Sequence, residues 1–117
     1  MELNTLDRIV ILGLLPKVGD ITTLRISREL ESRLGFSEEE HKRLKIEVNK
    51  RDGNIYWDSD ADAPINIDLG DVATRIIKDA LLEMNERRQL TRDHLSLYER
   101  FVEQPKVSKV LELAAAR

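Results

Sequence analysis

The spacing of the hydrophobic residues changes in the middle of this chain, and that change restricts its fold more than any other feature. Between residues 46 and 57 apolar and polar side chains alternate, whereas on both sides the apolar residues recur every three or four positions. The alternation is interrupted by Asp52 and Gly53, a dipeptide typical of a tight β-turn, so a hairpin is predicted. The hairpin residues expected to face the core are Ile46, Val48, Ile55 and Trp57. Residues 65–69 also alternate and predict a third short strand.

The chain begins with a segment that predicts a helix over residues 5–15. Asn4 or Thr5 can cap its start, and Pro16 ends it. Apolar residues lie most of the way round this helix. Such a helix is typical of the centre of a fold or of an oligomer interface.

Two further helices are predicted before the hairpin. Asp20 is a suitable N-cap for the second, which ends at Gly35. The third begins after Ser37, because Ser37 and Glu40 have the spacing of a capping box and the first turn is acidic, which suits the helix dipole.

Helical spacing returns after residue 69. A long helix is predicted from Gly70 and Asp71 to about Gln89, and the residues it is expected to bury are Val72, Ile76, Ala80 and Leu81 or their neighbours. Thr91 caps another helix through about Val102. This helix offers Leu97, Tyr98 and Phe101 to the core.

The expected fold class is therefore α+β: a helix-dominated single globular domain over residues 1–103, with a small two- or three-stranded antiparallel sheet. Residues 104–117 are predicted to form a C-terminal amphipathic tail helix. The apolar residues that keep helical spacing after Pro105 are Val107, Val110, Leu111 and Ala114. We expect this tail to dock on the domain or to swap onto a neighbouring copy.

The charge of the chain argues against nucleic acid as its partner. The net charge of the 117 residues is −3, and residues 36–68 hold nine acidic against five basic side chains. Proteins that bind nucleic acid normally show a basic surface, because contacts with phosphates supply most of the affinity. Nucleic acid is thus a less favoured partner than protein, although a local basic face would escape this count.

Composition also restricts the location and the chemistry. The chain has no cysteine, which excludes disulfides, thiolate nucleophiles and cysteine-based metal sites. Its first residues lack the basic segment of a secretory signal. The longest apolar run, residues 9–15, is far too short to span a membrane. A cytosolic protein with no membrane contact is expected.

One acidic segment resembles the start of a calcium-binding loop. Asp58, Asp60 and Asp62 have the required spacing. However, Ala63 stands where such a loop needs glycine, and Leu69 stands where it needs a bidentate glutamate. A solvated acidic turn is therefore favoured, with cation binding left as the alternative.

No catalytic machinery is recognisable. The only two histidines, His41 and His94, each fall near the start of a predicted helix beside acidic residues, which favours solvent-exposed positions. The glycine-rich phosphate-binding patterns and the G-x-S-x-G nucleophile pattern are absent. We expect no enzymatic activity, no cofactor and no metal, and no binding residue can be named from the sequence.

Three helices followed by a hairpin is also the order of elements in a winged-helix DNA-binding domain. In that fold the third helix enters the major groove. Here the third helix begins with Glu38, Glu39 and Glu40, which would meet the phosphates with like charge. The alternative basic face on the second helix consists of Arg25, Arg28 and Arg33. Glu29 and Glu31 interleave with these arginines, a pattern typical of a solvated helix with i,i+4 ion pairs.

Three segments of the chain resemble small uncharacterised proteins of tailed bacteriophages and prophages. They are residues 12–20 (LGLLPKVGD), residues 34–40 (LGFSEEE), and residues 90–101, where LT and HLSLYERF stand at 90–91 and 94–101. The resemblance covers most of residues 5–102 and not the tail. It implies a phage or prophage origin and transfers no activity and no site residue.

The expected function is that of a non-enzymatic, phage-encoded protein-interaction module. It would bind a host factor or belong to the virion, and it would self-associate, acting in the host cytoplasm or in the assembled particle. Small acidic phage proteins without catalytic motifs commonly act through a larger protein, an argument from association. A winged-helix-like DNA-binding regulator is the alternative.

Overall fold

The computed structural model describes residues 1–103 and shows a helix-dominated α+β fold, as predicted. In chain order the elements are β1 (Glu2–Leu3), α1 (Thr5–Leu14), α2 (Ile21–Leu34), α3 (Glu38–Leu44), β2 (Glu47–Val48), β3 (Ile55–Tyr56), the 3-10 turn η1 (Ser59–Ala61), β4 (Ile65–Asn66), α4 (Asp71–Glu86), α5 (Arg92–Tyr98) and the π-helical turn η2 (Glu99–Glu103). The predicted tail helix with Val107, Val110, Leu111 and Ala114 lies outside the described residues. Among residues 1–103, none of the helices combines the length and the apolarity needed to cross a bilayer.

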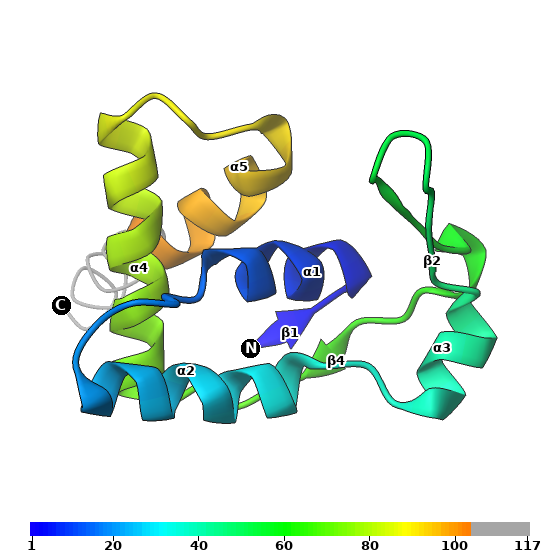
Figure 1. Cartoon of the computed structure of the whole chain (residues 1–117), viewed down its shortest axis with the longest axis horizontal. Coiled ribbons are helices and arrows are strands. Elements are labelled where there is room, and N and C mark those ends of the chain that lie inside the picture. The colour runs from blue at the N-terminus through cyan, green and yellow to red at the C-terminus, as the bar shows by residue number, and fades with distance from the viewer. Residues whose placement is uncertain (104–117) are drawn as a thin grey trace, which may run out of the picture.

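Helix α1 occupies the centre of the structure, one of the two positions that its apolar surface predicts. It packs against α2, α4, α5 and β1 (Figure 1). Asn4 caps it, and its backbone N–H in turn donates to the Asp7 carboxylate. Ile11 and Leu15 are buried in the core. The helix ends at Leu14, ahead of Pro16.

Helix α2 begins and ends where the sequence predicts, at Asp20 and Gly35. Gly35 has a φ of −63°, so the glycine does not end the helix through a left-handed conformation. It is favoured for another reason: a Cβ at this position would lie 3.0 Å from the Glu31 carbonyl oxygen.

Helix α4 buries one of the residues named from the sequence and the neighbours of two others. Its buried residues are Ala73, Ile77 and Leu81, so only Leu81 of the predicted set is fully buried. Val72 is 54% exposed. The helix carries two adjacent apolar stripes that are one residue apart in the sequence. Helices α1 and α2 and the turn η2 pack against the stripe that contains Ala73, Ile77 and Leu81.

Helix α5 is shorter than predicted, because the α-helix ends at Tyr98 and continues as the π-helical turn η2. Leu97 and Phe101 are nonetheless fully buried, as expected. The buried cluster that they join comprises Leu3, Ile11, Leu15, Leu30, Leu34, Ile67, Leu69, Ala73, Ile77, Leu81, Leu97 and Phe101.

The strands form two separate antiparallel pairs rather than one sheet. In the predicted hairpin, β2 pairs with β3 through Glu47 opposite Tyr56 and Val48 opposite Ile55. Its turn contains Gly53 at a φ of +72°, a conformation that glycine adopts without steric cost. The predicted third strand is limited to Ile65–Asn66 and pairs with β1 at the start of the chain.

The prediction that the hairpin faces the core is wrong. Val48 is 63% exposed and Ile55 38% exposed, while Ile46 and Trp57 are half-buried. Helix α3, the hairpin and η1 (residues 38–61) form a projection, called here the hairpin lobe (Figure 1). Within residues 1–103 the backbone of α3 lies close to η1 and to no other helix. The buried cluster of the core contains no residue of the hairpin.

Candidate functional site

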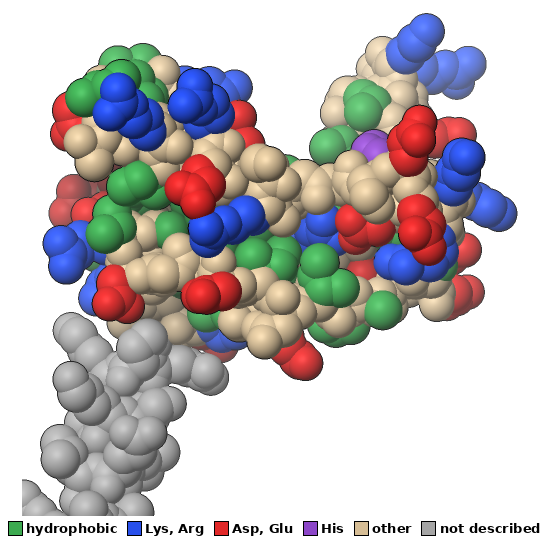
Figure 2. Space-filling model, turned by 90° about the horizontal axis from the view of Figure 1, so that it is seen from below, with side chains coloured by type: hydrophobic (Ala, Val, Ile, Leu, Met, Phe, Trp, Pro, Cys, Tyr) green, Lys and Arg blue, Asp and Glu red, His purple; other side chains and the backbone are tan. Residues whose placement is uncertain are grey.

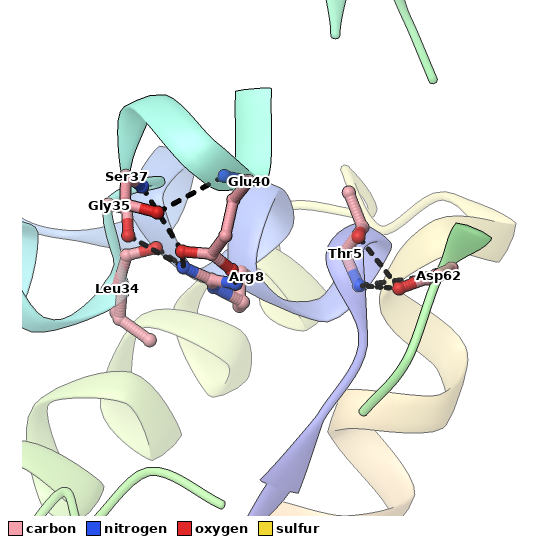
Figure 3. A network of polar contacts seen from close by, with 7 residues as sticks. All are labelled: Thr5, Arg8, Leu34, Gly35, Ser37, Glu40 and Asp62. Atoms are coloured by element: carbon pink, nitrogen blue, oxygen red, sulfur yellow. Dashed lines mark hydrogen bonds and ion pairs between the residues drawn. The ribbon is translucent and has the colours of Figure 1, made fainter. Parts of the chain in front are cut away.

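The hairpin lobe is attached to the rest of the structure through a buried arginine on α1. Arg8 is 3% exposed, and its guanidinium donates to the last carbonyl groups of α2. Its Nε lies 3.1 Å from the Leu34 oxygen, and its Nη2 lies 2.6 Å from the Gly35 oxygen (Figure 3). These carbonyls have no partner within the helix, so Arg8 closes the end of α2.

The same guanidinium pairs with Glu40 at the start of α3. Arg8 Nη1 lies 2.5 Å from Glu40 Oε2, and the guanidinium carbon lies 3.9 Å from the centre of the Phe36 ring. Hydrogen bonds from Arg8 lower the pKa of Glu40 from 4.5 to about 2, with help from the Ser37 N–H and against partial burial. Arg8 thus joins the starts of α1 and α3 to the end of α2.

A second attachment lies on the first turn of α1. Thr5 donates from its backbone N–H and its hydroxyl to Asp62 Oδ1, at 3.1 and 2.7 Å (Figure 3). In the same acidic segment, Asp58 caps η1 by accepting from the Asp60 N–H. Asp62 therefore has a different role from Asp58, since its carboxylate bonds Thr5 of α1. Within the described part of the chain, no three His, Asp or Glu side chains are grouped so that they could hold a metal ion.

The two histidines have local structural roles. His94 Nδ1 accepts from the Thr91 backbone N–H at 3.0 Å and completes a capping box at the start of α5. His41 is exposed and meets the Phe36 ring edge-on at a centroid distance of 6.1 Å. His94 Nδ1 also lies 2.9 Å from the Thr91 hydroxyl, so the whole contact belongs to the helix cap.

Of the basic residues considered for DNA binding, Arg25 and Arg28 are exposed and line a shallow hollow together with Glu29, whereas Arg33 is paired. On α2, Arg33 pairs with Glu29 at 2.5 Å and donates to the Asp68 carbonyl. This confirms one of the predicted i,i+4 ion pairs. On α3, Glu38 and Glu39 are exposed at the helix start, where a recognition helix would contact bases.

The hairpin carries three exposed apolar side chains, Val48, Ile55 and Tyr56, which together with the half-buried Trp57 are called here the hairpin face. Val48 and Tyr56 are 63% and 51% exposed. Together with Leu6, Ile9 and Val10 of α1, strand β3 and Trp57 line a groove of about 580 Å³. The hairpin face therefore offers both a projecting edge and a concave apolar surface.

The hairpin turn next to this face is basic and internally ordered. The Asp52 carboxylate accepts from the Asn54 N–H and from the Tyr56 hydroxyl, and both bonds lower the pKa of Asp52. Lys50 and Arg51 are exposed. Figure 2 shows the lobe standing apart from the body, with Lys and Arg side chains at its far end.

Comparisons with known proteins assign no family to this chain. It matches no protein-family model, no curated protein and no solved structure. The function must therefore be inferred from the geometry of these residues.

Arg8 was not predicted as a site residue, and Asp62 was considered only as part of a possible cation loop and not as a partner of Thr5. A signal for Arg8 was present, because it follows Asp7 inside an otherwise apolar helical segment. A charged side chain on a central helix has to be paired. The sequence contains no comparable signal for the identity of its partner, which lies 32 residues away.

Proposed function

We propose that this chain is a non-enzymatic protein-interaction module that contacts its partner through the hairpin face. One observation carries the proposal: the hairpin projects away from the core and leaves Val48, Ile55 and Tyr56 exposed. Contiguous exposed apolar side chains beside polar ones are characteristic of protein-binding surfaces.

The composition of the hairpin face supports this role. Tyrosine and tryptophan are enriched among the residues that dominate binding energy. The chain's single tryptophan, Trp57, is half-buried and lines the groove between α1 and β3 instead of lying in the core. The Arg8 and Asp62 contacts fix the lobe on α1, which reduces the entropy lost on binding.

The resemblance to phage and prophage proteins supports a partner in the bacterial host or in the phage particle. We accordingly propose the host cytoplasm or the virion as the place of action, with self-association as part of the role. The winged-helix-like DNA-binding alternative rests on the order of the elements and on Lys50 and Arg51 at the hairpin turn. It receives less support, because the exposed start of α3 is acidic.

The test is a pull-down from nuclease-treated bacterial lysate, comparing wild type with the double variant Val48→Asp/Ile55→Asp. Leu95→Asp is the matched control, since Leu95 is an equally accessible apolar residue on α5, 58% exposed. The hairpin variant should lose a stoichiometric protein that wild type and the control retain, with unchanged circular dichroism. Capture of the same proteins by all three chains would refute the role of the hairpin face. A DNA affinity that falls steeply with salt would instead favour the regulator.

A further inference from the structure

A second apolar surface lies at the opposite end of the molecule from the hairpin. It includes two hollows along α4, of about 440 and 500 Å³; α2 lines the first, and residues 14–18 and the start of α2 line the second. The surface that they form is called here the α4 groove, and its apolar lining residues include Val18, Ile26, Val72, Ile76 and Ala80. Val18 is 89% exposed and Val72 54% exposed. In Figure 1, α4 and the hairpin stand at opposite ends of the longest axis.

The α4 groove exists because α4 is apolar on two sides. One stripe, with Ala73, Ile77 and Leu81, is buried. The other stripe, with Val72, Ile76 and Ala80, follows at i,i+4 spacing and is half-buried or exposed. A soluble helix normally keeps its second side polar, so an apolar second stripe indicates a surface that is covered in the functional state.

The two surfaces differ in charge. The α4 groove is lined by the exposed carboxylates of Asp68, Asp71 and Asp79, none of which takes part in an ion pair within residues 1–103. Over the same described range, Lys17 is the one groove-lining cation outside an ion pair. The hairpin turn presents Lys50 and Arg51, which are also outside ion pairs in this range. Apolar contact with opposite charge beside it favours association of one surface with the other.

We infer that the hairpin face of one copy binds the α4 groove of a second copy of this chain. The inference rests on the proposed function and names its partner. Each surface carries its charges close to its apolar residues: Lys50 and Arg51 follow Val48 at the hairpin turn, and Asp71 precedes Val72 at the start of α4.

This contact is head-to-tail, so it leaves one hairpin and one groove free on every pair. Such heterologous contacts continue into closed rings or open filaments, whereas a symmetric dimer would stop at two copies. Hairpin-to-hairpin pairing would bring Lys50 and Arg51 of the two copies together and is disfavoured by like charge. The copies are therefore expected to associate in one direction, with the hairpin of each copy on the α4 groove of the next.

Two blocked variants test the polarity directly by analytical ultracentrifugation. The hairpin-blocked chain is Val48→Asp/Ile55→Asp, and the groove-blocked chain is Val18→Asp/Val72→Asp; all four residues are exposed, so both chains should fold. Wild type should associate, with a mass that rises with concentration. Each variant alone should be monomeric at the concentrations at which wild type associates. Their equimolar mixture should form complexes of two chains and no larger species, because one intact pair of surfaces remains. A mixture that stays monomeric would overturn the inference, as would a variant that associates like wild type.

A charge exchange tests the ionic contacts. Lys50→Glu/Arg51→Glu and Asp68→Lys/Asp71→Lys should each weaken association about tenfold or more, which is the effect of losing one strong interface contact. Combining both exchanges in one chain should restore association. Lys42→Glu/Arg43→Glu, on α3 of the same lobe, is the matched control and should leave association unchanged. Absence of rescue in the combined chain would overturn the charge pairing.

These experiments separate the inference from the proposed function. Wild type that is monomeric at all concentrations would show that a second copy is not the partner. If the hairpin-blocked chain then loses a captured protein, the proposal that the hairpin face binds a protein partner is still supported. If a monomeric wild type is destabilised by Val72→Asp, the α4 groove is covered from within the chain and the inference fails. If blocking the hairpin changes neither association nor capture, both proposals fail.

Discussion

Glu40→Gln measures how strongly the ion pair with Arg8 holds the hairpin lobe to α1. The pKa of Glu40 is lowered from 4.5 to about 2, chiefly by hydrogen bonds from Arg8. A shift of this size corresponds to at most about 3 kcal/mol between the charged and neutral forms. Because the Glu40 side chain is 18% exposed, water screens part of this interaction. The substitution should therefore lower the free energy of unfolding by about 1–2 kcal/mol at neutral pH.

The pH dependence of that difference follows from the sign of the shift. The folded-state pKa of Glu40 lies below its unfolded value, so its contribution to stability is complete above pH 4.5 and is lost as the pH falls towards 2. The difference between wild type and Glu40→Gln should be constant from pH 7 to about 5 and should then shrink towards zero. Urea unfolding followed by far-ultraviolet circular dichroism measures it, since the fold is mainly helical.

The control for this experiment is Glu39→Gln, which changes an exposed carboxylate on the same first turn of α3. It should alter stability by less than about 0.5 kcal/mol. If Glu40→Gln and Glu39→Gln cost the same, or if the Glu40→Gln difference does not depend on pH between 5 and 2, the argument that Arg8 holds the lobe through Glu40 is refuted.

Three further predictions concern stability, each measured by urea unfolding. Leu81→Ala should lower the free energy of unfolding by about 2–5 kcal/mol, because it opens a cavity in the core. Val72→Ala should lower it by less than about 1 kcal/mol, because Val72 is exposed. Equal losses would contradict the observation that α4 buries Leu81 and not Val72. Asp62→Ala should lower the free energy of unfolding by about 1–2 kcal/mol, because the hydrogen bonds from Thr5 are lost. Asp60→Ala should leave it almost unchanged. Similar losses for the two variants would instead fit a cation bound by both carboxylates. Gly53→Ala should cost about 1–2 kcal/mol because φ is +72°, and a neutral effect would show that the turn relaxes.

The element boundaries were largely determined by the sequence alone, because the interactions that set them are local. Asp20, Ser37 and Thr91 each accept from a backbone N–H two or three residues further along the chain, so the cap and the helix start are encoded together. The hairpin is equally local: Asp52 bonds Asn54, and Gly53 adopts the turn conformation. These predictions are confirmed.

The candidate site could be predicted only in part. The sequence correctly placed Val48, Ile55 and Tyr56 on two paired strands, and Trp57 lies one residue beyond β3. It wrongly assigned their apolar side to the core, since alternation shows that one side is apolar and not what covers it. The Arg8–Glu40 pair could not be predicted, because it joins residues 32 positions apart.

Tertiary structure alone decided which apolar surfaces are buried. Helix α4 has two apolar stripes that differ by one residue, and only the arrangement of α1, α2 and η2 selects Ala73, Ile77 and Leu81. The short strand at Ile65–Asn66 was predicted from its alternation, but its pairing with Glu2–Leu3 instead of the hairpin depends on a contact across 60 residues of chain or more. Capping and turn geometry depend on neighbours in the sequence, whereas burial depends on which distant segments meet. The hairpin face and the α4 groove were therefore visible in the sequence as apolar patterns and became surfaces only in the folded chain.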